Sequence, residues 1–139
     1  MQNYFALVKD FHRKYGFSTT SNLIVTPTLS VPAAQLATIA KDLQQANDAE
    51  IRLHLIIEEV AELAAAICEG NKVETLDALA DLLYVVVGTA VTFNLPLHEA
   101  FIEVHRSNMT KSIERSRPGH PKKGNNYSPP NLSVLLDKE

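Results

Sequence analysis

This 139-residue chain is poor in cysteine and lacks signal-peptide features and long uninterrupted apolar runs. Its single cysteine, Cys68, cannot form an internal disulfide, which favours a reducing, cytoplasmic setting. The N-terminal stretch "MQNYFALVKDFHRKYG" does not have the basic-then-apolar order of a signal peptide, so we do not expect secretion. The apolar run of residues 75–93 is interrupted and falls short of the roughly 20 residues of a membrane span, so no membrane partner is expected.

The chain also lacks a strongly basic surface. It carries 13 Lys and Arg against 16 Asp and Glu, which gives a net charge of −3. Acidic residues dominate up to His105, and basic residues dominate after it. This distribution does not indicate a nucleic-acid-binding protein, whereas an acidic body with a basic tail suits a ligand made of metal and phosphate.

Glycine and proline are rare within the periodic segments, and no strand-like alternation persists. The sequence therefore predicts an all-α bundle of four to five helices. We expect a helical domain over residues 1–115 and an extended tail over residues 116–139 that packs on the domain or on a partner subunit. The expected helices cover roughly residues 3–14, 32–45, 48–69, 71–93 and 97–115.

Acidic side chains gather on the third and fourth expected helices. Glu58 and Glu62 are i,i+4 neighbours opposite the apolar face of the third helix, and Glu59 borders the same stripe. Taken alone, this stripe fits a solvated polar face equally well. The fourth helix changes the balance, because it is apolar nearly all round and Asp77 and Asp81 lie on its one polar stripe.

A helix that is apolar on most sides is expected to be buried, and buried aspartates need a positive partner. This helix has no Lys or Arg beyond Lys72 at its start, so a divalent cation shared with the glutamates is the simplest partner. Ligand sets made only of oxygen atoms suit Mg²⁺, with Mn²⁺ as an alternative. The predicted metal ligands are Glu58, Glu59, Glu62, Asp77 and Asp81.

Four further side chains are candidates for binding a substrate. Asn108, Lys111 and Arg115 share one face of the expected fifth helix, where the two cations would neutralise phosphate oxygens and the amide would contact a base or sugar. For Lys111 and Arg115, an ordinary solvated face is an equal alternative. Tyr84 lies on the aspartate stripe, although a tyrosine that belongs to the core is the more ordinary interpretation.

The segments "EEVAEL", "DALADLLYVVVGTA" and "EVHRSNMTK" together resemble the MazG-like all-α nucleoside triphosphate pyrophosphohydrolases, and more narrowly their phosphoribosyl-ATP pyrophosphohydrolase-like branch. The resemblance covers most of the chain and is weakest over residues 18–47. It implies a Mg²⁺-dependent enzyme that cleaves nucleoside triphosphates between the α and β phosphates. It also implies removal of non-canonical or surplus nucleotides, Glu58 and Glu59 as catalytic residues, and assembly into a homodimer or homotetramer.

The chain departs from the family pattern at one position. The family has Glu-Glu-x-x-Glu followed by Glu-x-x-Asp, and Glu58, Glu59, Glu62 and Asp81 match it, but Ala78 stands where the second element has its glutamate. Asp77 is the expected replacement.

Two alternative functions stay open. The first is a phosphoribosyl-ATP pyrophosphohydrolase, and the second is a nucleotide-binding helical protein without turnover. The residues do not specify which base the protein prefers.

Overall fold

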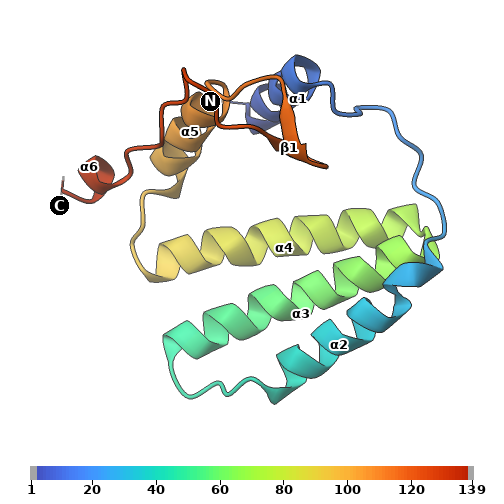
Figure 1. Cartoon of the computed structure of the whole chain (residues 1–139). Helices are drawn as coiled ribbons and strands as arrows, with labels where there is room; N and C mark the ends of the chain where they lie inside the picture. The colour runs from blue at the N-terminus through green and yellow to red at the C-terminus, as the bar shows by residue number, and fades with distance from the viewer. Residues whose placement is uncertain (1–2, 138–139) are drawn as a thin grey trace. The chain divides into compact units, whose positions relative to one another are not determined.

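The computed structural model describes residues 3–137, which are mostly helical with one small two-stranded sheet (Figure 1). This confirms the predicted all-α class. The chain forms two compact units, Met1–Ser21 with Pro96–Glu139 and Asn22–Leu95. The predicted division at residue 115 stays a prediction.

The unit of residues 22–95 contains a short 3₁₀ helix and three α-helices. Their bounds are η1 Pro27–Leu29, α2 Ser30–Asp42, α3 Asp48–Glu69 and α4 Lys72–Thr92. Asparagine side chains begin the two long helices, because Asn47 accepts from the backbone N–H of Glu50 at 2.9 Å and Asn71 accepts from that of Glu74 at 3.1 Å. Gly70 ends α3 with a φ of 66°, a conformation that favours glycine.

Helix α3 lies at the centre of this unit and packs against both α2 and α4 (Figure 1). The packed surfaces are built largely of alanine, whose small side chain lets helix backbones approach closely. These buried alanines are Ala33, Ala40, Ala61, Ala66, Ala78 and Ala90. The carboxylates on α3 and α4 are thereby fixed at a close helix–helix contact.

Arg52 of α3 supplies a cation to α4, which the pattern of α4 alone did not predict. Its guanidinium donates to the backbone carbonyl of Val85 at 3.2 Å and to the hydroxyl of Thr89 at 3.5 Å. A Cβ atom at Gly88 would lie 2.4 Å from Nη2 of Arg52, so this glycine makes room for the guanidinium. Asp81 lies on α4 about two turns before Gly88. Within residues 3–137, Arg52 forms no ion pair with Asp81.

The expectation that α4 is buried on most sides is wrong within residues 22–95. The side chains of Leu76, Leu83 and Val91 are 70%, 61% and 74% exposed, because only one face of α4 packs against α3. By length and composition α4 would also suit a membrane span, but a single helix of this kind is weak evidence. The structure therefore leaves a large apolar face of α4 open.

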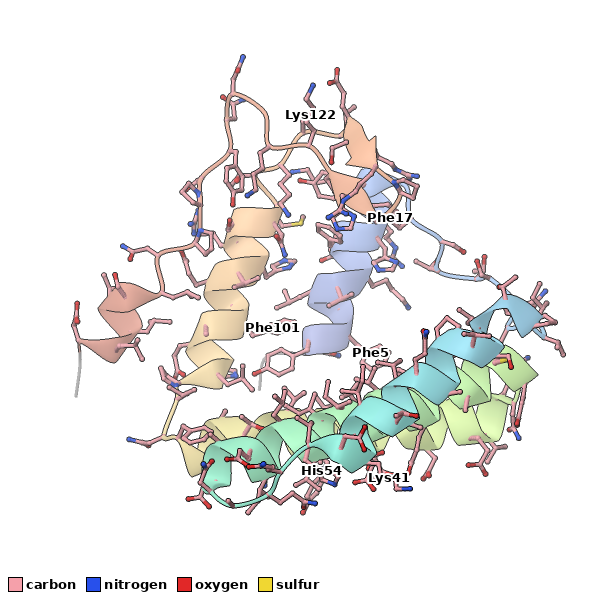
Figure 2. All side chains as sticks on the ribbon, turned by 60° about the horizontal axis from the view of Figure 1, so that its bottom comes forward. Phe5, Phe17, Lys41, His54, Phe101 and Lys122 are labelled. Carbon is pink, nitrogen blue, oxygen red and sulfur yellow. The ribbon has the colours of Figure 1, made fainter. Side chains whose placement is uncertain are left out.

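The other unit is built on α1 (Tyr4–Tyr15) and α5 (Leu97–Asn108), which lie side by side (Figure 2). The rings of Tyr4 and Phe101 are 4.4 Å apart near the helix starts. The hydroxyl of Tyr15 donates to the carbonyl of Asn108 at 2.8 Å at the helix ends. The two helices therefore run parallel.

The structure corrects the length of the last long helix. We predicted a helix to Arg115, but α5 ends at Asn108, so Lys111 and Arg115 lie beyond it and share no helical face with Asn108. The chain then forms a hairpin of β1 (Arg115–Arg117) and β2 (His120–Pro121), and later the short helix α6 (Ser133–Leu136). The predicted tail thus contains regular structure.

Candidate metal and nucleotide site

Three carboxylates converge where α3 faces α4. One ligand oxygen from each of Glu59, Glu62 and Asp81 lies within 4.8 Å of the others. Glu59 and Glu62 are three residues apart, which places them on one side of α3, and Asp81 approaches from α4. The helix–helix contact therefore brings three of the five predicted metal ligands together from two parts of the sequence, and their role as ligands stays a prediction.

Glu59 is the most perturbed member of this carboxylate cluster. Desolvation by burial, together with the negative charges of Glu62, Asp81 and Glu58, raises its pKa from 4.5 to about 7. Its Oε2 atom is buried and has no hydrogen-bond partner among the described residues. Such an atom is costly to bury unless something binds it, because it has given up its hydration.

A hard divalent cation fits this cluster. The donors are all carboxylate oxygens, which are the ligands that Mg²⁺ and Mn²⁺ prefer. A cation would offset the mutual repulsion of the three charges and would provide a partner for the orphaned Glu59 oxygen. Glu62 and Asp81 are exposed, so the cluster is also open to a ligand from solvent.

Two of the predicted metal ligands lie outside this cluster. Glu58 points instead toward His54, with Oε2 3.7 Å from the imidazole Nε2. Asp77 is exposed on α4, one turn before Asp81, and is not among the converging oxygens. Ala78, which occupies the family's glutamate position, is 3% exposed and belongs to the packed core of this unit.

A groove between α2 and α3 shares Glu62 with the acidic cluster. Its volume is about 770 Å³, and its lining includes Lys41, His54, Glu58 and Glu62. His54 donates from Nδ1 to the carbonyl of Ala40 at 2.8 Å, which leaves Nε2 facing Glu58. Figure 2 shows Lys41 and His54 on these neighbouring helices. The sequence favours a surface or packing role for His54 over a place beside the metal ligands, although its i,i+4 spacing from Glu58 allows the two side chains to meet, and it indicates no role for Lys41.

The predicted substrate-binding residues are found in different surroundings. Tyr84 is 81% exposed on α4, so it is not the core tyrosine of the alternative interpretation. Arg115 donates from Nη2 to the carbonyls of Tyr15 and Gly16 at 3.0 and 2.9 Å and lies over the ring of Phe17. Its guanidinium therefore already has partners within its own unit.

Asn108 and Lys111 remain candidates within the same unit as Arg115. The backbone carbonyls of both residues accept hydrogen bonds from the hydroxyl of Tyr15, each at 2.8 Å. Lys111 lines a hollow between the ends of α1 and α5 and the segment of residues 124–126. The buried Tyr15 thus fixes the backbone that carries both candidates.

Comparisons with known proteins identify a matching family and one viral relative. Residues 34–108 match the family model described as phosphoribosyl-ATP pyrophosphohydrolase, a range that includes the three converging carboxylates and Asn108. The chain is also 45% identical over 80 residues to uncharacterized protein L479 of Acanthamoeba polyphaga mimivirus. That alignment covers 57% of this chain and 28% of the viral protein, so the chain spans only a minor part of its relative. No solved structure matches the chain.

Proposed function

Since the chain belongs to the phosphoribosyl-ATP pyrophosphohydrolase family, we propose that it is a Mg²⁺-dependent nucleoside triphosphate pyrophosphohydrolase. Family membership supports a pyrophosphohydrolase-type activity in general. The finer proposal is cleavage between the α and β phosphates, which gives a nucleoside monophosphate and pyrophosphate. The observation that carries it is the convergence of Glu59, Glu62 and Asp81 around a buried carboxylate oxygen that has no partner.

In this proposal Glu59, Glu62 and Asp81 hold the cation. A bound Mg²⁺ supplies Lewis-acid polarisation of phosphate oxygens and lowers the pKa of water. Glu58, outside the three converging oxygens and adjacent to Glu59, is the proposed base that takes the proton from the attacking water. Its neighbour His54 is held by the carbonyl of Ala40, so the imidazole and the carboxylate keep a fixed relation.

A panel of nucleotides tests this activity directly. We expect release of pyrophosphate, and not orthophosphate, from at least one nucleoside triphosphate when Mg²⁺ or Mn²⁺ is present. The panel holds canonical, deoxy and modified nucleotides, including deoxyuridine triphosphate, because removal of surplus or non-canonical nucleotides in the cytoplasm is the proposed role. The absence of pyrophosphate release from every member would contradict the proposal.

The family description itself supports a second candidate, hydrolysis of phosphoribosyl-ATP. Ala78, in place of the family's glutamate, counts against it. Complementation of a histidine auxotroph lacking this enzyme separates the two activities. Tight nucleotide binding in calorimetry with no turnover of any panel member would instead favour the third candidate, a nucleotide-binding protein without catalysis.

The proposed assembly is a homodimer or homotetramer, supported by the open apolar face of α4. We expect light scattering to give two or four times the 15.3 kDa mass of one chain. Placing a charge on this face with Leu83→Glu is expected to lower the mass, whereas Val31→Glu, at an exposed position on α2, serves as the matched control. A wild-type mass of one chain would contradict the proposal.

A further inference from the structure

We propose that the hollow at the ends of α1 and α5 is a binding pocket for a phosphate oxyanion. The hollow has a volume of about 520 Å³ and is formed within the unit of residues 3–21 and 96–137. Its lining includes Lys14, Thr110, Lys111, Ser112, Asn125 and Asn126. Of these, sequence reasoning identified only Lys111 as a candidate.

The charge of this phosphate pocket selects for an anion. Lys14 and Lys111 both line it, and no Asp or Glu is among the described residues that do. This is notable in a chain whose net charge is −3. Two lysines that line one cavity without a carboxylate make its surroundings electropositive, which favours an anionic ligand.

Hydrogen-bond donors in the phosphate pocket remain available to a ligand. Lys14 donates from Nζ to the carbonyl of Met109, which places the ammonium at the pocket and uses one of its three donors. The amide side chains of Asn125 and Asn126 form no hydrogen bond with the rest of residues 3–137. Ammonium and amide groups are suitable donors for the several acceptor oxygens of a phosphate.

The walls of the phosphate pocket are held in place by the fold. The backbone N–H of Ser112 donates to the carbonyl of Lys122 at 2.8 Å, and that of Lys122 donates to the carbonyl of Glu114 at 2.7 Å. The hydroxyl of Thr110 accepts from the backbone N–H of Ser128 at 2.8 Å. These bonds fasten the tail beside the end of α5, so the pocket exists before any ligand arrives.

Gly124 allows a close contact at one point of this wall. A Cβ atom at Gly124 would lie 3.2 Å from the Cβ of Ser112, which is tighter than an ordinary contact. The tail therefore approaches Ser112 closely just where Asn125 and Asn126 follow in the sequence.

The ligand of the phosphate pocket has two possible sources, free pyrophosphate and the phosphates of a nucleotide. Only the nucleotide source rests on the proposed function.

Calorimetry on the full chain tests the phosphate pocket with pyrophosphate in metal-free buffer that contains a chelator. We expect Lys14→Gln and Lys111→Gln each to weaken pyrophosphate binding by about tenfold or more, because each removes a charged donor. Lys14→Arg is expected to restore most of the binding lost in Lys14→Gln. Lys9→Gln, a substitution on the same helix outside the lining, is the control, and circular dichroism confirms that each variant folds.

A second titration uses a non-hydrolysable nucleoside triphosphate in the same buffer. If Lys14→Gln weakens the binding of both pyrophosphate and the nucleotide, the pocket is supported and free pyrophosphate is one of its ligands. If Lys14→Gln weakens only the binding of the nucleotide, the pocket is supported with the nucleotide as the source of the phosphate. Equal binding by wild type, Lys14→Gln and Lys111→Gln in both titrations overturns the pocket. An inactive chain that still binds pyrophosphate through Lys14 contradicts the proposed function alone, and an active chain indifferent to both lysines contradicts the pocket alone.

Discussion

Replacing Asp81 by asparagine is expected to lower kcat/KM for nucleotide hydrolysis roughly a hundredfold or more, the scale at which a group that stabilises transition-state charge is lost. The substitution keeps the size of the side chain and removes its charge. Among the described residues Asp81 is the converging carboxylate from α4, so the substitution leaves the cation with anionic donors from a single helix. Pyrophosphate release at saturating Mg²⁺ measures the effect, and circular dichroism confirms the fold.

Two other substitutions on α4 make this result specific. Asp77→Asn is expected to cost less than about tenfold, the lower range for groups outside the metal's own ligands, because Asp77 is not among the converging oxygens. Glu74→Gln removes an exposed carboxylate in the first turn of the same helix and is the matched control. Equal losses for Asp77→Asn and Asp81→Asn would instead show that Asp77 completes the metal site, as the sequence predicts.

The three converging carboxylates could be predicted from the sequence because helical spacing determines which side chains share a face. Glu59 and Glu62 are three residues apart on one helix, and Asp81 lies on the single polar stripe of the next. Periodicity does not separate Asp81 from Asp77, since residues one turn apart point the same way. Which of the two reaches Glu59 depends on how α3 and α4 cross, and the crossing depends on packing between the helices.

The end of α5 illustrates a different limit of sequence reasoning. After Asn108 the sequence has no Pro or Gly until Pro118, so nothing local marks the end of the helix. The structure satisfies the free carbonyls there with a distant residue, because the Tyr15 hydroxyl donates to the carbonyls of Asn108 and Lys111. Tertiary contacts thus determine the last turn, and they also create the pocket that contains Lys14 and Lys111.

The exposed apolar face of α4 has the same physical origin. Its pattern shows that the helix is apolar, but burial depends on what packs against each side. Only α3 covers it within residues 22–95, and Ala78 and Ala90 are the α4 side chains that become fully buried. Sequence analysis could therefore predict the composition of the helix and not its exposure.

Replacing Glu59 by glutamine is expected to make the metal-free protein more stable at pH 8 and to remove part of its pH dependence. The pKa of Glu59 is about 7 in the folded chain, against 4.5 as its ordinary value. Between these two values the folded state keeps a proton that the unfolded state has released. Stability from this group is therefore present below about pH 4.5, falls as the pH rises toward 7, and is lost above it. Thermal unfolding in chelator from pH 5 to 8 measures the difference.

Glu69→Gln removes an exposed carboxylate on the same helix. This control variant is expected to retain the wild-type pH dependence.

Added Mg²⁺ supplies the second half of the test. At a concentration about a hundred times its Kd, a ligand that binds only the folded state adds about 2.7 kcal/mol to the free energy of unfolding. At pH 8, where Glu59 is ionised, wild type is expected to gain more from Mg²⁺ than Glu59→Gln does, and the gain is expected to shrink as the pH falls below 7. Mg²⁺ could instead add equally to the free energy of unfolding of wild type and Glu59→Gln at every pH. Protons and Mg²⁺ would then not compete for the Glu59 carboxylate, which would show that Glu59 does not hold the cation.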